Sequence, residues 1–439
     1  MLTKQQQIAE LARNDLSAVF TSLNAALDME LLLRAYKLTN KSGAVGVDGQ
    51  SSEDYAKDLD ANLTDLLKRL KSGGYCAPPV RRVRIPKAGS RAETRPLGIP
   101  TFEDKIAQRA VLMLLESVYE PLFHRCSFGF RPGRSAHQAL CYLRDELMEK
   151  GQRWVLDVDV RKYFDTIDHQ KLRVFLDQRV KDGVIRRLID KWLKAGILES
   201  GQWSRTTSGT PQGGVISPLL ANIYLHYVLD EWFDTMVKPR MNQRVTLTRF
   251  ADDFVIGCED YADSQRILKV LPKRFSRFGL ELHPEKTKLI DFRFKRPNGM
   301  VSHASGISFD FLGFTHVWGK SRRGKPVIFQ RTAKDRYKRS LKAISDYCRR
   351  ARHMPISEQH EVLCRRIQGH YAYFAITGNA YRIRCFLHEV QRIWQKWLTR
   401  RTRSLSKPWK RFERIYTLYP LPKARIVHQY QAARSETAS

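Results

Sequence analysis

Residues 246–258 read Thr-Leu-Thr-Arg-Phe-Ala-Asp-Asp-Phe-Val-Ile-Gly-Cys, an apolar stretch interrupted in its middle by two adjacent aspartates. The β-branched and aromatic residues on both sides of Ala251-Asp252-Asp253 predict two short strands joined by a tight turn. Adjacent carboxylates on such a turn repel each other, and acids beside buried strands are costly unless they bind cations or hydrogen-bond donors. The acid pair is therefore the first candidate for a functional site.

A second apolar stretch carries further candidate acids. Trp154–Val160 predicts a buried strand that contains Asp157 and Asp159, and Asp165 follows shortly after. The residues alone leave open which of the three would act with the hairpin. Two divalent cations bridging carboxylates from separate strands would relieve the repulsion and hold a triphosphate for in-line attack by a 3′-hydroxyl. Because an isolated Asp-Asp pair is usually an exposed turn, this hypothesis depends on other motifs.

The composition indicates a polyanionic partner. Lys and Arg number 77 against 45 acidic residues, a formal charge of +32 over 439 residues, and that length suggests two or three subdomains. Nucleic acid fits this charge, since each neutralised phosphate releases a counterion. An anionic membrane surface is the alternative, but we find no basic amphipathic helix, lipid anchor or long apolar run. Seven scattered cysteines without a CxxC pair argue against a disulfide framework or a zinc module.

Several elements can be predicted around these acids. Val80–Pro86 alternates like a strand, and a helix should begin near Thr101, where Thr101 and Asp104 have capping-box spacing. A second helix should begin at Ser217 and Pro218, with Ser217 as N-cap. From about Lys320 to Arg425, Lys and Arg outnumber Asp and Glu by more than four to one, which predicts a domain boundary.

Seven motifs occur in order along the chain. They are RPLGIP (95–100), GFRPGRSAHQA (129–139), DVRKYFDTIDH (159–169), GTPQGGVISPLLANI (209–223), RFADDFVIG (249–257), HPEKTKLI (283–290) and FLGF (311–314). This set resembles the group II intron reverse transcriptases, from about residue 40 to 315 and more weakly through the basic C-terminal part. Phe250 stands where that family often has Tyr. Phe lacks the hydroxyl but keeps the aromatic ring, so we expect activity to survive.

The resemblance implies which acids bind metal. In that family the residues matching Asp159, Asp252 and Asp253 carry two Mg²⁺ ions, for which Mn²⁺ can substitute, and this register selects Asp159 over Asp157. The resemblance also places Val160 among the metal ligands. The catalytic residues are therefore expected to be Asp159, Asp252 and Asp253.

Five further residues are expected to bind the nucleotide. Lys87 and Arg95 match residues that close over the triphosphate, and a point charge with a forked guanidinium suits phosphate oxygens. Phe164 matches an aromatic residue beneath the incoming sugar, where its bulk would clash with a 2′-hydroxyl, and Gln212 matches a residue beside the nucleotide pocket. Lys286 follows the hairpin and is expected near the triphosphate or in proton transfer. By themselves, Phe164 could equally be a core residue and Lys286 a solvated surface lysine.

The resemblance implies an α+β right-hand fold, with fingers and palm around an antiparallel palm sheet, followed by an α-helical thumb or maturase domain. We expect an N-terminal extension (1–50), fingers and palm (51–320), the thumb (321–430) and a tail (431–439). Tyr371, Tyr373 and Phe374 in the thumb are candidates for base stacking, although such aromatics more often pack a helical bundle.

The expected function is RNA-directed DNA synthesis together with intron RNA binding, splicing assistance and a role in intron mobility. The expected partners are RNA template, intron RNA, a DNA or RNA primer, target DNA and deoxynucleoside triphosphates, with no membrane and a cytoplasmic, nucleoid-associated location. No Cys/His-rich segment follows residue 430, so we expect the compact branch that lacks an endonuclease. The alternatives are a domesticated reverse transcriptase in defence or repair, and an RNA-binding splicing factor without synthesis.

Overall fold

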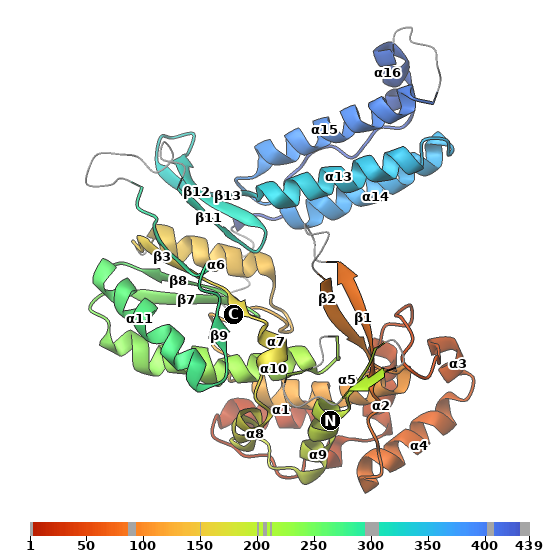
Figure 1. Cartoon of the computed structure of the whole chain (residues 1–439), viewed down its shortest axis with the longest axis vertical. Helices are drawn as coiled ribbons and strands as arrows, with labels where there is room; N and C mark the ends of the chain where they lie inside the picture. The colour runs from red at the N-terminus through yellow and green to blue at the C-terminus, as the bar shows by residue number, and fades with distance from the viewer. Residues whose placement is uncertain are drawn as a thin grey trace. The chain divides into compact units, whose positions relative to one another are not determined.

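The computed structural model describes residues 3–86, 94–149, 151–199, 202–204, 209–210, 213–294, 307–401 and 408–430. The chain forms two compact units, each built from two separate stretches of sequence. Unit 1 contains Met1–Ser135 and Leu156–Leu289, and unit 2 contains Ala136–Val155 and Ile290–Ser439. The content is mixed α and β, as predicted (Figure 1).

Unit 1 contains the hairpin and most of the predicted site residues. Its helices are α1 (Lys4–Asn14), η1 (Leu23–Ala26), α2 (Met29–Leu38), α3 (Ser52–Ala56), α4 (Leu59–Ser72), α5 (Phe102–Tyr119), α7 (Tyr163–Thr166), α8 (His169–Asp177), α9 (Gly183–Lys194), α10 (Ser217–Leu225), η2 (His226–Asp230), η3 (Phe233–Val237), η4 (Lys238–Arg240) and α11 (Tyr261–Arg277). Its strands are β1 (Val80–Pro86), β2 (Thr94–Ile99), β4 (Val160–Arg161), β5 (Ile197–Glu199), β6 (Gln202–Ser204), β7 (Val245–Phe250), β8 (Asp253–Cys258) and β9 (Glu281–Leu282). Strands β3 (Trp154–Val158) and β10 (Lys288–Asp291) lie where the chain passes between the two units.

Helix α5 is the central helix of unit 1. It is buried on nearly all sides, and it packs against α1, α2 and α10. The Thr101 hydroxyl caps its first turn by accepting from the backbone N–H of Asp104. The capping box is only half formed, because the Asp104 carboxylate turns inward and accepts hydrogen bonds from Tyr75, Trp192 and Gln108.

The strands of unit 1 form short sheets. One sheet has the order β2-β1-β5-β6, in which β1 and β2 are antiparallel from Arg81↔Ile99 to Pro86↔Thr94. The acid hairpin belongs to a second sheet, ordered β10-β3-β8-β7, and β4 pairs separately with β9. The predicted strands over Val80–Pro86, Trp154–Val160 and the hairpin are therefore confirmed, except that the second breaks at Asp159 into β3 and β4.

Helix α10 begins one residue earlier than predicted. Ile216 is the N-cap, so Ser217 and Pro218 occupy the first two helical positions. The helix then continues through two wide π turns, η2 and η3. Such turns are rare and often lie at functional sites.

Unit 2 combines a small sheet with long helices. Its elements are α6 (Ala136–Glu149), β11 (Ser308–Phe311), β12 (Phe314–Lys320), β13 (Pro326–Thr332), α13 (Lys334–Arg350), α14 (Ile356–Phe374), α15 (Ala380–Thr399) and α16 (Pro408–Leu418). The sheet order is β11-β12-β13, α6 packs against β13, and α13 and α14 each pack against α15 (Figure 1). Trp394 is fully buried in this core and donates to the Gln359 side chain.

The predicted stacking residues of unit 2 are packing residues. Tyr371 is buried in the helical core. The rings of Tyr373 and Phe374 both pack against Phe314, and the Tyr373 hydroxyl donates to the Leu312 carbonyl. Tyr371 is therefore a packing residue, whereas Tyr373 and Phe374 pack within the protein but stay half-buried.

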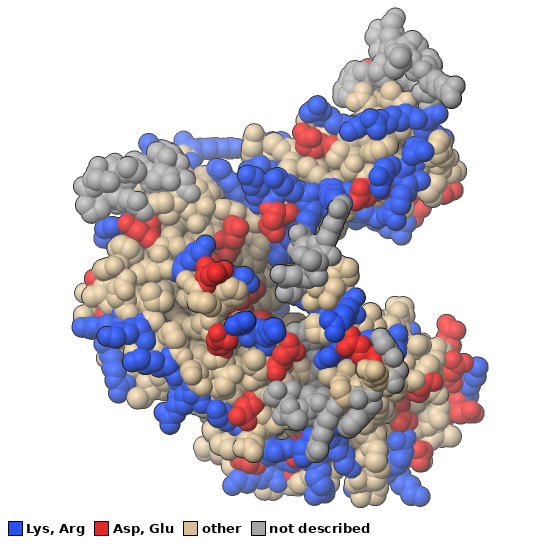
Figure 2. Space-filling model, viewed as in Figure 1, with Lys and Arg blue, Asp and Glu red and all other residues tan. Residues whose placement is uncertain are grey.

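The cationic character of unit 2 is visible on its surface. Figure 2 shows Lys and Arg gathered over α13, α14 and α15. On α13 the exposed cations are Lys334, Arg336, Lys338, Lys342, Arg349 and Arg350. Over the described part of the chain, no helix combines the length and apolarity that crossing a bilayer requires.

Candidate active site

The two adjacent aspartates lie at the tip of the β7–β8 hairpin. The antiparallel ladder ends at Phe250↔Asp253, so Ala251 and Asp252 form a two-residue turn. Ala251 has φ 57°, the left-handed value that the first central residue of a primed hairpin turn requires. Asp253 begins β8 and is exposed, whereas Asp252 is partly buried.

Asp159 lies in the break between β3 and β4. The pairing of β4 with β9 fixes this position, and the backbone N–H of His283 donates to the Asp159 carbonyl at 2.8 Å. The Asp159 carboxylate forms an ion pair with the Lys286 ammonium, with 3.0 Å between Oδ2 and Nζ. The structure therefore places Lys286 at the candidate site, although its side chain is still 60% exposed.

The charge of Asp159 acts on Asp252. Burial raises the pKa of the Asp252 carboxyl, and the charge of Asp159 raises this pKa further, while Arg95 and Arg249 lower it. Asp159, the alternative that the family register selects, is thus one of the charges that act on Asp252, while its role as a metal ligand stays a prediction. Two acids in mutual repulsion are a suitable donor set for a divalent cation, because oxygen ligands are what Mg²⁺ prefers.

The third aspartate does not complete a metal cluster. Within the described ranges, no group of three or more His, Cys, Asp or Glu side chains is arranged to hold a metal ion. The convergence of Asp159, Asp252 and Asp253 on shared ions therefore stays a prediction. The same is true of Val160, whose side chain is buried and whose backbone pairs with Leu282.

Other predicted nucleotide-binding residues lie on neighbouring elements. Arg95 is exposed on β2, opposite Ile85 of β1, and its charge acts on Asp252. Phe164 is half-buried on α7 with its ring against Tyr163. Lys87 and Gln212 lie outside the described residues.

The Gly-rich motif begins and ends in tight contacts. A Cβ on Gly209 would come within 2.7 Å of the Phe164 carbonyl oxygen, and one on Gly213 within 2.4 Å of the Gly98 carbonyl oxygen. Thr210 also donates its N–H to the Phe164 carbonyl. Close backbone approach is a usual reason for glycine, and here it joins the motif to α7 at one end and to β2 at the other.

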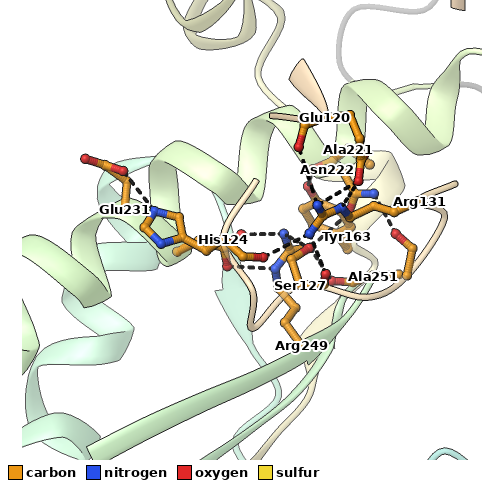
Figure 3. Close-up of polar contacts among 12 residues, drawn as sticks. Glu120, His124, Ser127, Arg131, Tyr163, Ala221, Asn222, Glu231, Arg249 and Ala251 are labelled. Carbon is orange, nitrogen blue, oxygen red and sulfur yellow. Dashed lines mark hydrogen bonds and ion pairs between the residues drawn. The ribbon is translucent and has the colours of Figure 1, made fainter. Parts of the chain in front are cut away.

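Sequence reasoning missed a group of buried polar residues behind the hairpin. Arg249 on β7 is fully buried, and it contacts Ser127, Asn222, Asp230 and the Ala251 carbonyl (Figure 3). The sequence does contain one indication of this group, a charged residue within the apolar stretch 245–250. A charge buried in a strand is nearly always paired, so Arg249 should have a buried partner. The sequence does not say with which residue it pairs.

Comparison with known proteins agrees with this geometry. Residues 85–316 match the family described as reverse transcriptase (RNA-dependent DNA polymerase). The chain is 41% identical over 225 residues to the group II intron-encoded protein LtrA of Lactococcus lactis subsp. cremoris, covering 50% of this chain and 37% of that protein. It is 37% identical over 284 residues to protein YkfC of Escherichia coli strain K12, covering 57% of this chain and 74% of that protein.

A plant relative is more distant. Nuclear intron maturase 2, mitochondrial, of Arabidopsis thaliana is 30% identical over 177 residues, which is 31% of this chain and 24% of that protein. The chain thus spans well under half the length of two of these three relatives. The match over residues 85–316 takes in the hairpin, Asp159 and the Gly-rich motif, and it confirms the resemblance predicted from the seven motifs. The chain belongs to the reverse transcriptase (RNA-dependent DNA polymerase) family, among the relatives of group II intron-encoded proteins.

Proposed function

We propose that this protein copies an RNA template into DNA, extending a primer 3′-end with deoxynucleoside triphosphates. The observation that carries the proposal is that residues 85–316, which match the reverse transcriptase family, contain both Asp159 and the hairpin turn with Asp252 and Asp253, and that the charge of Asp159 acts on Asp252. Members of this family generally use divalent metal ions. Mutual repulsion between two carboxylates is what a bound divalent cation would relieve.

Asp159, Asp252 and Asp253, with Val160, would hold two Mg²⁺ ions, or Mn²⁺ in their place. The bound ions would supply charge stabilisation for the attacking and leaving oxygens of an in-line displacement. The charge of Arg95 acts on Asp252, and its guanidinium would donate hydrogen bonds to the phosphate oxygens of the incoming nucleotide. Lys87, Phe164 and Gln212 complete the proposed nucleotide set, and Lys286 would exchange its ion pair with Asp159 for contact with the triphosphate.

A right-hand arrangement follows from this assignment. The β1–β2 hairpin would belong to the fingers, the β7–β8 sheet to the palm, and α13–α15 to the thumb. The exposed cations of α13 would bind the phosphates of template-primer and intron RNA. The names of LtrA and of the plant maturase support a splicing role beside synthesis. A cytoplasmic location, with nucleoid association when DNA is the target, would accompany these activities.

Primer extension on an RNA template with Mg²⁺ tests the proposal. We expect the native chain to synthesise DNA and Asp252→Asn to lose at least about a hundredfold in rate, since an amide keeps the shape and removes the charge. RNA binding should change by less than about twofold. Asp60→Asn, at an exposed aspartate on α4, is the matched control and should behave like the native chain.

The outcome separates the alternatives. Equal synthesis by the native chain and Asp252→Asn would overturn the site assignment. RNA binding without synthesis in the native chain would instead support the splicing factor that does not polymerise. A defence or repair role keeps the chemistry, and it would be indicated by synthesis combined with no preference for intron RNA.

A further inference from the structure

Arg249 forms an ion pair that is completely removed from water. Both Arg249 and the side chain of Asp230 have no exposed surface, and the Arg249 Nη2 approaches Asp230 Oδ2 closely. Taking two charges out of water costs about as much as their attraction returns, so an apolar pair of similar volume is often equally stable. Stability alone is therefore a weak reason for this pair.

Every N–H of the Arg249 guanidinium has an acceptor. Nε and one Nη2 hydrogen point at the Asp230 carboxylate, and the other Nη2 hydrogen points at the Ser127 hydroxyl at 2.7 Å. Nη1 donates to the Asn222 side chain at 2.9 Å and to the Ala251 carbonyl at 3.0 Å. All five donors of the guanidinium are thus used, which fixes its orientation (Figure 3).

The bond to Ala251 ties the guanidinium to the turn that carries Asp252. Ala251 has a positive φ, which a non-glycine residue adopts only when its surroundings impose it. A hydrogen bond from a rigid, buried guanidinium to the Ala251 carbonyl supplies such a constraint. The direction of the Asp252 side chain then depends on where Arg249 is held.

The backbone at Gly129 also contacts the Ala251–Asp252 turn. The Asn222 amide donates to the Gly129 carbonyl at 2.7 Å, and a Cβ on Gly129 would lie 2.3 Å from the Ala251 nitrogen. Arg131 donates to the Ser127 carbonyl at 2.7 Å and also pairs with Glu120 at the end of α5. The segment 126–129 is thereby fixed against β7 and the turn.

The π turn η2 aligns the two helical partners of Arg249. Asn222 and Asp230 are eight residues apart, so in a regular α-helix their side chains would differ by about 80° around the axis. A π turn takes roughly one residue more than an α turn, which reduces this difference. Both side chains can then reach one guanidinium.

We propose that Arg249 is a positioning residue that holds the Ala251–Asp252 turn, with Asp230, Asn222 and Ser127 holding Arg249 in turn. The inference rests on the proposed role of Asp252 as a metal ligand. The buried polar residues behind the hairpin would then serve to orient a metal ligand. Mutating residues that hydrogen-bond to metal ligands usually lowers metal affinity or activity about tenfold to a hundredfold.

The combined variant Arg249→Met with Asp230→Leu tests the proposal, because it removes both charges and leaves neither one unpaired. We expect its thermal midpoint and its RNA affinity to stay close to those of the native chain. Turnover in primer extension should fall about 10–100-fold, and the affinity for Mn²⁺, measured directly by electron paramagnetic resonance, should fall by about tenfold or more. Turnover and Mn²⁺ affinity both within twofold of native would overturn the proposal.

Two single variants keep the test decisive if the combined variant does not fold. Arg249→Lys retains the charge but cannot make all five bonds, and Arg179→Lys is its control at another buried arginine of unit 1, which bonds the Asp15 and Leu16 carbonyls. We expect reduced turnover and Mn²⁺ affinity in the first only. Ser127→Ala deletes a single acceptor and should lower turnover several-fold. Unchanged values in both Arg249→Lys and Ser127→Ala would contradict a positioning role.

The reference variant Asp252→Asn separates this proposal from the proposed function. If Asp252→Asn loses synthesis while the Arg249 variants keep it, the function stands and the positioning role is wrong. If Asp252→Asn keeps synthesis, the site assignment itself is wrong.

Discussion

At the scale of single residues, Asp104 is a buried carboxylate of unit 1 that lies outside the hairpin. It accepts from the Tyr75 hydroxyl at 2.5 Å, from Trp192 Nε1 at 2.7 Å and from Gln108 Nε2 at 2.9 Å. Gln108 in turn accepts from the Ile216 N–H at the start of α10. Burial raises the pKa of Asp104 to about 6 despite these donors.

The raised pKa of Asp104 predicts a pH dependence of stability. The folded chain holds this proton more tightly than the unfolded chain, so the stability contributed by Asp104 is fully present below about pH 4. It is lost as the pH rises through about 6, and the change from 3.8 to about 6 corresponds to about 3 kcal/mol. Asp104→Asn should remove this component. Between pH 4.5 and 7 the free energy of unfolding, measured in urea, should therefore fall in the native chain relative to that of the variant. Parallel profiles of the two proteins would contradict the assignment.

At the scale of secondary structure, local pattern was sufficient wherever an element is decided by its own residues. The hairpin, β1 and α5 follow from alternation, turn residues and an N-terminal Thr, and the structure confirms them. The partnership of Arg249 with Asp230 could not be predicted. It depends on a π turn that brings Asp230 beside Asn222. The sequence carries no periodic pattern that marks where a helix takes one extra residue in a turn. Likewise, whether Tyr371 faces RNA or a helical core depends on neighbours 20 or more residues away.

Helix α13 has the properties of a phosphate-binding element. Lys334, Arg336, Lys338 and Lys342 are exposed along it, while Ile344 and Cys348 are buried. Changing these four cations to Gln should weaken RNA binding and flatten its salt dependence. Each lost phosphate contact lowers the slope of log K against log salt by about 0.7–0.9, so the loss of four contacts would lower it by about 2.8–3.6. Filter binding of RNA at several salt concentrations measures this slope.

A matched variant in unit 1 separates a local effect from general charge. Arg266, Lys269, Lys273 and Arg277 are exposed along α11, and changing them to Gln removes the same charge from another helix. We expect the α13 variant to lose much more slope than the α11 variant. Equal losses would mean that the net charge of +32, and not α13, accounts for the salt dependence.

At the scale of the whole molecule, the compact units do not follow the order of the sequence. Unit 2 resumes at Ile290 and also includes Ala136–Val155, while the domain boundary expected near residue 320 from the change in composition stays a prediction. The cause is long-range packing that composition cannot reveal. Helix α6 lies against β13, where Gln330 donates to the Leu140 carbonyl at 2.8 Å.

This topology predicts that a chain ending at residue 320 will not behave as an isolated polymerase domain. Truncation there removes β13, which pairs with β12 from Phe314↔Thr332 to Lys320↔Pro326. It thereby also removes Ile328 and Gln330, which hydrogen-bond to Arg144 and to the Leu140 carbonyl of α6. Helix α6, whose apolar residues Leu140, Leu143 and Leu147 are buried in the full chain, would lose these contacts. We expect the truncated chain to aggregate in size-exclusion chromatography and to bind the dye ANS, while a chain ending at residue 430 does neither. A monomeric truncated chain with no dye binding would show that α6 does not depend on β13. If the truncated chain misfolds, its loss of RNA binding says nothing about where RNA binds. The charge variants of α13 are therefore the sharper test of the RNA-binding surface.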